Sequence, residues 1–118
     1  MSEKPVDPDC LFCRIVAGEI PATIVHTSDT TVAFRDLNPQ APTHVLVVPR
    51  SHYANAAALA AGEASTMADL IDAAAAVAAS EGVDSYRLVF NTGADAGQTV
   101  FHAHLHVLGG RAFTWPAG

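Results

Sequence analysis

Three histidines at alternate positions are the residues of this chain best suited to chemistry. His102, His104 and His106 stand in the stretch FHAHLHVLGG, separated by Ala103 and Leu105. Because successive side chains of a strand point to opposite faces, this spacing predicts three imidazoles on one face and apolar groups on the other. Imidazoles fill a hydrophobic core poorly, so the pattern is typical of a half-buried strand whose open face carries out chemistry.

The chemistry that fits this pattern is nucleophilic attack on phosphorus. A neutral imidazole can form a covalent bond to a phosphorus centre, which water later breaks. Such a nucleophile needs a partner on its other ring nitrogen and donors aimed at the phosphate oxygens. His104 follows the glycine-rich loop Asn91 to Thr99, whose amides can form an anion-binding concavity, with Gln98 and Thr99 as side-chain donors. We therefore take His104 as the candidate nucleophile.

Two other interpretations of the histidines stay open. They can be solvated strand residues, although three alternating imidazoles disfavour this. They can also bind a metal, since neighbouring rings lie about 6.6 Å apart at their backbones and can share one zinc ion. Because His102 and His106 would lie about 13 Å apart along a strand, one zinc held by all three is disfavoured. A zinc hydrolase is thus the weaker alternative.

The remaining chemistry-bearing pair is the CxxC formed by Cys10 and Cys13. The start of the chain, MSEKPVDPDC, has no basic stretch followed by an apolar one, so we expect a cytoplasmic protein. A structural disulfide is disfavoured in such a compartment. Metal ligation, redox chemistry or simple packing remain as interpretations of the pair.

Composition excludes several function classes. The chain has 118 residues, a formal net charge of −6, and six Lys and Arg in no cluster, so nucleic-acid binding is not expected. No apolar run approaches the roughly 20 residues that span a bilayer, so no membrane association is expected. GxxxxGK and GxGxxG motifs are absent, which argues against a P-loop or a dinucleotide fold, and no organic cofactor is expected.

The elements that must position these residues follow from periodicity and turn residues. The pattern predicts a short helix over Cys10–Ala17, strands over residues 23–28, 31–35, 44–48, 86–90 and 100–108, alanine-rich sequence over 54–61, and one long helix over 63–81. Residues 1–9 read as a flexible tail. Strands segregated from helix predict an α+β fold, with an antiparallel sheet of about five strands covered by one long helix.

The motifs resemble one family. HAHLHVL fits the H-φ-H-φ-H-φ-φ signature of the histidine triad (HIT) superfamily. Four longer stretches resemble the nucleotide-binding branch of this superfamily: IVAGEIPA, DLNPQAPTHVLVVPRSH, VFNTGADAGQTVFHAHLHVLGG and WPAG. The similarity covers residues 10–118 and implies a single domain with a HIT-like fold. It also implies a homodimer with sheets joined edge to edge. The activity it implies is hydrolysis of purine nucleoside 5′-phosphoramidates, AMP–amine and related AMP–X conjugates, through a nucleotidyl-histidine. A nucleotide-binding interaction module with residual catalysis is the alternative.

The resemblance also implies residue roles. His104 matches the nucleophile, and His106, His102 and Thr99 join it as catalytic residues. The implied nucleotide contacts are Asn91, Gly97, Gln98 and Thr99 in the phosphate loop, Asp36 at the ribose, Phe12, Leu37 and His44 in the nucleoside pocket, and Trp115 in a tail that can reach toward the partner subunit's active site.

A CxxC before the first helix is similar to that of bacterial relatives and of galactose-1-phosphate uridylyltransferase, where two cysteines and two histidines hold zinc. Carried over to this chain, the ligands are Cys10, Cys13, His52 and His102. Four protein ligands leave no open position, so this zinc would be structural. His102 would then anchor its strand instead of donating a proton.

Overall fold

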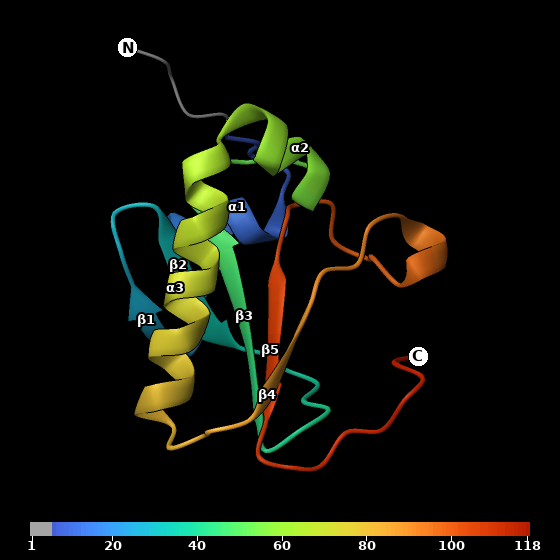
Figure 1. The fold of residues 1–118 in the computed structure, drawn as a ribbon. Coiled ribbons are helices and arrows are strands. Elements are labelled where there is room, and N and C mark those ends of the chain that lie inside the picture. Colours follow the sequence, from blue (N-terminus) through green and yellow to red (C-terminus); the bar gives the residue numbers. More distant parts are fainter. Residues whose placement is uncertain (1–5) are drawn as a thin grey trace.

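A five-stranded antiparallel sheet, in the order β1-β2-β3-β5-β4, forms the centre of the computed structural model, which describes residues 6–118 (Figure 1). The elements are α1 (Leu11–Val16), β1 (Ile24–Thr27), β2 (Thr31–Arg35), β3 (Thr43–Pro49), α2 (Ala56–Gly62), α3 (Ala64–Ser80), β4 (Tyr86–Val89), the 3-10 turn η1 (Ala94–Ala96) and β5 (Leu105–Gly109). The predicted α+β fold is confirmed, with its long helix and its short N-terminal helix. The alanine-rich segment before the long helix adds a third, α2, capped by the Asn55 side chain, which accepts from the amide of Ala58 at 2.9 Å.

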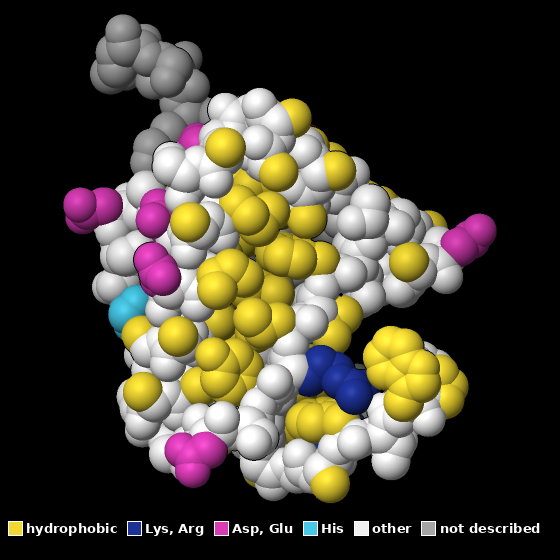
Figure 2. Space-filling model, viewed as in Figure 1, with side chains coloured by type: hydrophobic (Ala, Val, Ile, Leu, Met, Phe, Trp, Pro, Cys, Tyr) yellow, Lys and Arg dark blue, Asp and Glu magenta, His cyan; other side chains and the backbone are white. Residues whose placement is uncertain are grey.

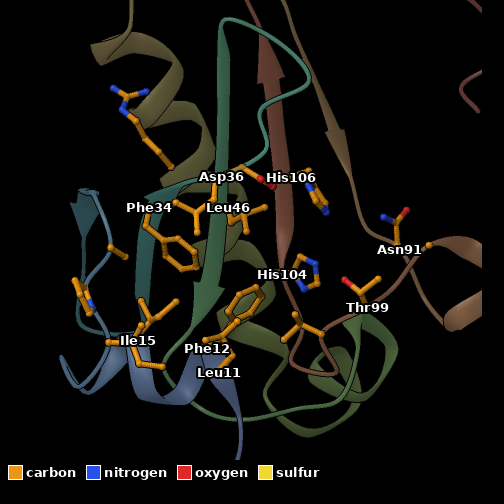
Figure 3. Close-up of a pocket in the computed structure, with 17 residues that line it drawn as sticks. Leu11, Phe12, Ile15, Phe34, Asp36, Leu46, Asn91, Thr99, His104 and His106 are labelled. Carbon is orange, nitrogen blue, oxygen red and sulfur yellow. The ribbon is translucent and has the colours of Figure 1, made fainter.

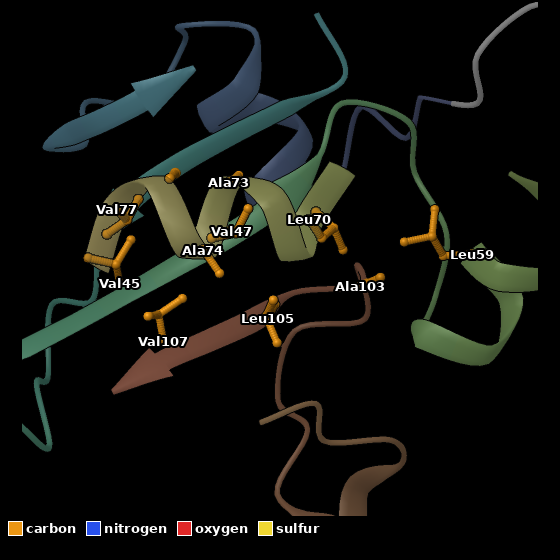
Figure 4. Close-up of a cluster of buried hydrophobic side chains, with 11 residues drawn as sticks. Val45, Val47, Leu59, Leu70, Ala73, Ala74, Val77, Ala103, Leu105 and Val107 are labelled. Atoms are coloured by element: carbon orange, nitrogen blue, oxygen red, sulfur yellow. The ribbon is translucent and has the colours of Figure 1, made fainter. Parts of the chain in front are cut away.

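The long helix α3 packs on one face of the sheet. Its alanine-rich buried stripe lets the helix approach closely, and this stripe contacts apolar side chains of β3 and β5 (Figure 4). The cluster consists of Ala33, Val45, Val47, Leu59, Leu70, Ala73, Ala74, Val77, Ala103, Leu105 and Val107. The apolar residues between the histidines therefore face the helix, as their alternation predicts. No helix in residues 6–118 is long and apolar enough to cross a membrane.

The opposite face of the sheet carries α1 and the histidines. A second cluster joins Phe12 of α1 to Phe34 of β2 and Leu46 of β3, and Phe12 and Phe34 meet edge to face with centroids 5.5 Å apart. Cys10 and Cys13 are buried in the same cluster. The cysteines and the histidines thus share one side of the sheet.

The predicted histidine strand over residues 100–108 is wrong at its start, because β5 begins only at Leu105. Pairing of Val47 with Leu105 would bring Ala103 opposite Pro49. Proline has no N–H to donate, so the ladder cannot continue there. The Ala103 amide instead donates to the carbonyl of Tyr53 at 2.7 Å. His102 and His104 consequently lie on an irregular segment leading into the strand.

The predicted flexible tail, residues 1–9, lies partly outside the described residues, since these begin at residue 6. Within the described part, the amide of Cys10 donates to the carbonyl of Asp7 at 3.0 Å and closes a turn. This turn leads directly into α1, where the Cys10 sulfur accepts from the Cys13 amide at 3.4 Å.

Candidate active site

A cavity of about 300 Å³ lies between α1, the sheet and the loop of residues 91–99 (Figure 3). One end is apolar and the other is polar, a division that suits a flat base and a phosphate. The apolar end is lined by Leu11, Phe12, Ile15, Phe34 and Leu46, and the polar end by Asp36, Asn91, Gly97, Thr99, His104 and His106. Sequence reasoning missed Phe34 and Leu46. They are direct cross-strand partners on the face opposite the helix, so strand alternation could have found them.

His104 is held in one tautomer. Its Nδ1 lies 2.7 Å from the carbonyl oxygen of His102. A carbonyl only accepts hydrogen bonds, so Nδ1 must carry the proton and Nε2 must carry the lone pair. The ring is buried and meets Phe12 edge to face, with centroids 5.0 Å apart. Because His104 lines the cavity, its unprotonated nitrogen is available to a ligand there.

His106 is oriented by a chain of hydrogen bonds through His44. The amide of Gln40 donates to His44 Nδ1 at 3.0 Å, so neutral His44 carries its proton on Nε2. That Nε2 lies 2.9 Å from His106 Nδ1 and 3.4 Å from Asp36 Oδ2. Donation to His106 makes its Nδ1 an acceptor and leaves its Nε2–H free to donate. The site thus presents a lone pair on His104 Nε2 beside an N–H donor on His106 Nε2.

Burial keeps the imidazoles of His106 and His44 neutral. It lowers the pKa of His106 from 6.5 to about 4, with smaller contributions from the neighbouring His104 and His44. Burial also lowers the pKa of His44, partly opposed by the Asp36 carboxylate. Neutral rings preserve the donor and acceptor assignments above. The ring centroids of His104 and His106 are 5.1 Å apart, so both can reach one bound group.

The glycine-rich loop is shaped by Gln98 and Gly97. Gln98 is 3% exposed, accepts from the amide of Gly93 at 2.9 Å and donates to the carbonyls of Ala54 at 2.7 Å and Val100 at 3.1 Å. Gly97 has a φ of +96°, which a side chain would strain. Gln98 does not line the cavity, so its side chain acts on the loop, while Asn91 and Thr99 face the ligand space.

Cys10, Cys13, His52 and His102 form a separate cluster behind the cavity, with all their ligand atoms within 4.8 Å of one another. His102 Nδ1 lies 3.4 Å from Cys10 Sγ, 3.5 Å from Cys13 Sγ and 3.2 Å from His52 Nδ1, and Cys13 Sγ lies 3.4 Å from His52 Nδ1. Ligands of a tetrahedral zinc lie about 3.3 Å apart for two nitrogens and about 3.5 Å apart for sulfur and nitrogen, from bond lengths of about 2.0 and 2.3 Å. The two sulfurs and two nitrogens fit such an ion.

Hydrogen bonding also supports His102 as a zinc ligand. Its Nε2 lies 2.9 Å from the carbonyl of Pro49, so Nε2 carries the proton and the Nδ1 lone pair faces the cysteines. Burial lowers the pKa of His102 to about 4 and raises that of the Cys13 thiol to about 11. A cation at the centre of the cluster would offset the cost of burying a charged thiolate, because it supplies a neighbouring positive charge.

The structure therefore divides the histidine triad between two sites. His102 lies in the cysteine cluster, and only His104 and His106 line the cavity. Leu37 lies at the cavity rim with its side chain 99% exposed. His44 lies behind His106. Trp115 is 83% exposed and does not line the cavity.

Comparisons with known proteins agree with this arrangement. A family model described as HIT domain matches residues 17–113. An uncharacterized HIT-like protein of Synechocystis sp. is 48% identical over 111 residues, covering 93% of this chain and 97% of that one. The 14 kDa zinc-binding protein of Zea mays is 41% identical, covering 95% and 90%. The purine nucleoside phosphoramidase of Escherichia coli is 41% identical, covering 87% and 88%. The structure of a HIT family hydrolase from Clostridium thermocellum superposes with a TM-score of 0.91 at 39% identity, covering 95% and 99%.

Proposed function

Because the chain belongs to the HIT domain family, as its histidine motif predicts, we propose that it hydrolyses purine nucleoside 5′-phosphoramidates, AMP–amine and related AMP–X conjugates. The similarity to the E. coli purine nucleoside phosphoramidase supports this substrate class. The observation that carries the proposal is the 2.7 Å contact of His104 Nδ1 with the His102 carbonyl, which leaves Nε2 unprotonated at the cavity.

The reaction proceeds in two displacements. His104 Nε2 donates its lone pair to phosphorus, a nitrogen–phosphorus bond forms, and the bond to the amine breaks. The leaving nitrogen takes up a proton, and we assign its relay from solvent to the hydroxyl of Thr99, which lines the same cavity as His104. Water then attacks phosphorus and gives up a proton to solvent, which replaces the proton taken by the amine; the bond to His104 breaks, and AMP is released.

Donors around the cavity stabilise the charge that builds on the phosphate oxygens. The Nε2–H of His106 and the side chains of Asn91 and Thr99 face the same space as His104 Nε2. Because the contact with His44 orients the His106 ring before the substrate arrives, this donor needs little reorganisation in the transition state.

The other end of the cavity holds the nucleoside. The base enters the apolar slot formed by Phe12, Ile15 and Phe34, and the Asp36 carboxylate accepts from the ribose hydroxyls. Leu37, at the rim, covers the bound nucleoside. Trp115, exposed on the C-terminal tail, reaches toward the active site of a partner subunit.

The test is turnover of a fluorogenic adenosine phosphoramidate by the parent, by His104→Ala and by His26→Ala, a matched histidine variant in β1 outside the cavity. We expect turnover by the parent and the control, inhibition by AMP, and loss of at least about a thousandfold in His104→Ala, as for removal of a catalytic nucleophile. A parent that binds AMP without turnover would instead be a nucleotide-binding module.

We also propose that Cys10, Cys13, His52 and His102 hold a structural zinc ion. Support comes from the near-tetrahedral donor spacing and from similarity to the zinc-binding protein of Zea mays. When bound, the ion keeps the two thiolates charged and ties α1 to the segment before β5. Reduced thiols at this site fit a reducing compartment, and we propose the cytoplasm.

Metal analysis tests the zinc site. Purified parent is expected to contain about one zinc per chain. A double variant, Cys10→Ser with Cys13→Ser, should contain none, and His106→Ala should keep it. If zinc persists in the cysteine variant and is lost in His106→Ala, the ligands belong to the histidine triad, and this result would support a zinc hydrolase.

We further propose a homodimer formed at the β4 edge. β4 pairs only with β5, so its other edge is free within residues 6–118. In Figure 2, apolar side chains form a band beside α3. Ile71 of α3 is 43% exposed, and Tyr86 of β4 is 39% exposed. Light scattering should give twice the mass of one chain, and Ile71→Glu should give the monomer mass. A monomeric parent would refute the interface.

A further inference from the structure

A second cavity, of about 260 Å³, lies beside the first, at the C-terminal tail. The two cavities share Asn91 and His106 in their walls, so they meet where the phosphate would lie. The remaining residues of the second cavity come from β3, β4, β5, the tail and the segment before β3, and they include Arg87, Arg111 and Phe113. The function proposed above gives this cavity no role.

Two positive charges line this cavity without a neutralising carboxylate. The chain has only six Lys and Arg against twelve Asp and Glu. Among the described residues 6–118, the arginines that pair with carboxylates are Arg14 and Arg35. Neither Arg87 nor Arg111 makes such a pair. An acidic chain thus places two unneutralised arginines next to the reaction centre.

Both guanidinium groups are held in place and still have donors to offer. They contact the ring of Phe113, with Arg111 Cζ 4.2 Å and Arg87 Cζ 5.0 Å from the centroid. Arg111 donates to the carbonyls of Gln40 at 2.9 Å and Ala112 at 3.0 Å, and Arg87 donates to that of Thr114 at 3.1 Å. Each guanidinium has five N–H donors, so most of them remain available to a ligand or to water.

The distribution of charged side chains on one face of the molecule fits this arrangement. In Figure 2, dark blue side chains appear at a single place, in the hollow between the η1 lobe and the C-terminal tail. The acidic side chains visible in the same view lie away from this hollow. The Asp36 carboxylate lies 3.4 Å from His44 Nε2 but does not line this cavity, so the charged side chains that face an entering anion are the two arginines.

Substrate geometry connects this cavity to the reaction. On the proposed function, the nucleoside fills the apolar end of the first cavity, and the phosphate lies at the polar end, which His104 and Asn91 line. In a displacement at phosphorus, the attacking and leaving atoms lie roughly in line. The leaving group therefore points away from His104, toward the wall that the two cavities share.

We propose that the second cavity binds the leaving group of the substrate and that this group carries a negative charge, a carboxylate or a phosphate, which Arg87 and Arg111 recognise. The proposal rests on the proposed phosphoramidase function. A guanidinium pair can hold such a group by bidentate hydrogen bonds, which gives both orientation and charge selection.

The experiment compares three substrates: AMP joined through nitrogen to alanine, the methyl ester of the same conjugate, and the unsubstituted AMP–NH2. We expect kcat/KM for the acid to exceed that for the ester by about tenfold, the size of one well-placed ionic hydrogen bond. The ratio should fall to about one in Arg111→Gln, recover in part in Arg111→Lys, and stay unchanged in the remote control Arg14→Gln.

A binding arm distinguishes a phosphate from a carboxylate and does not depend on turnover. ADP should compete more strongly than AMP in the parent and equally in Arg87→Gln if the second cavity accepts a phosphate. A higher kcat/KM for the acid than for its ester, together with equal competition by ADP and AMP, would assign a carboxylate ligand. Equal rates for acid and ester, together with equal competition by ADP and AMP, would overturn the proposal even if AMP–NH2 is hydrolysed. Failure to hydrolyse any of the three substrates would overturn the phosphoramidase function and the leaving-group assignment with it.

Discussion

Replacing Gln98 by Glu should separate a residue that shapes the phosphate loop from one that contacts the nucleotide. Glu has nearly the same shape, but an ionised carboxylate cannot donate. The variant therefore loses the bonds to the carbonyls of Ala54 and Val100, now 2.7 and 3.1 Å long, in a site only 3% exposed. The bond accepted from the Gly93 amide can persist.

The expected cost follows from these contacts. Two lost hydrogen bonds, each worth about 1 kcal/mol, and two carbonyls left unpaired beside a buried charge give a loss of about 2–4 kcal/mol. For a chain of this length, a loss of that size lowers the melting temperature by roughly 10 °C. The loop would also shift, so AMP affinity should fall together with stability.

Thermal unfolding and AMP titration of the same samples provide the assay. Thr92→Glu is the matched control, because it adds the same charge to an exposed position of the same loop, and its melting temperature should change by less than about 2 °C. A Gln98→Glu protein with parental stability and at least tenfold weaker AMP binding would refute the reasoning. Gln98 would then contact the nucleotide directly, as the sequence resemblance implied.

Two further predictions concern stability. The pKa of His106 is lowered from 6.5 to about 4, so its preference for the neutral state stabilises the fold fully above pH 6.5, and this contribution is lost as the pH falls toward 4. Urea unfolding across this range should show stability falling with acid, and His106→Gln should show a shallower fall; parallel curves would contradict the assignment. Leu70→Ala, at a fully buried position of α3, should cost about 2–5 kcal/mol, whereas Leu37→Ala, at a fully exposed residue, should cost less than about 0.5 kcal/mol. Equal losses in urea unfolding would place Leu70 outside the core.

Local patterns predicted the fold well because most of its elements are determined by local sequence. Alternation around Leu105 and Val107 identified the face that packs on α3, and the alanine-rich spacing identified the helix itself. The start of the histidine strand was not predictable in this way. It depends on the pairing register, which places Ala103 opposite a proline that is more than fifty residues away in sequence.

The candidate site was predictable only where residues belong to a recognisable motif. The motif pointed to His104 and the loop, and the structure places both at one cavity. It did not point to Phe34, Arg87 or Arg111, because their position depends on how distant strands and the tail pack together. No spacing rule along the chain brings Arg87 and Arg111 to the same aromatic ring.

His102 explains why the cysteine cluster lies directly behind the candidate nucleophile. Its imidazole is held on both nitrogens, by the Pro49 carbonyl and by the cluster, so the residue has little freedom to move. Its own carbonyl oxygen then accepts from His104 Nδ1. On the proposed function, the position of one backbone oxygen fixes both the tautomer and the direction of the attacking nitrogen. The cluster therefore needs no contact with the substrate to matter for catalysis, because whatever holds the His102 ring also holds the hydrogen-bond partner of His104.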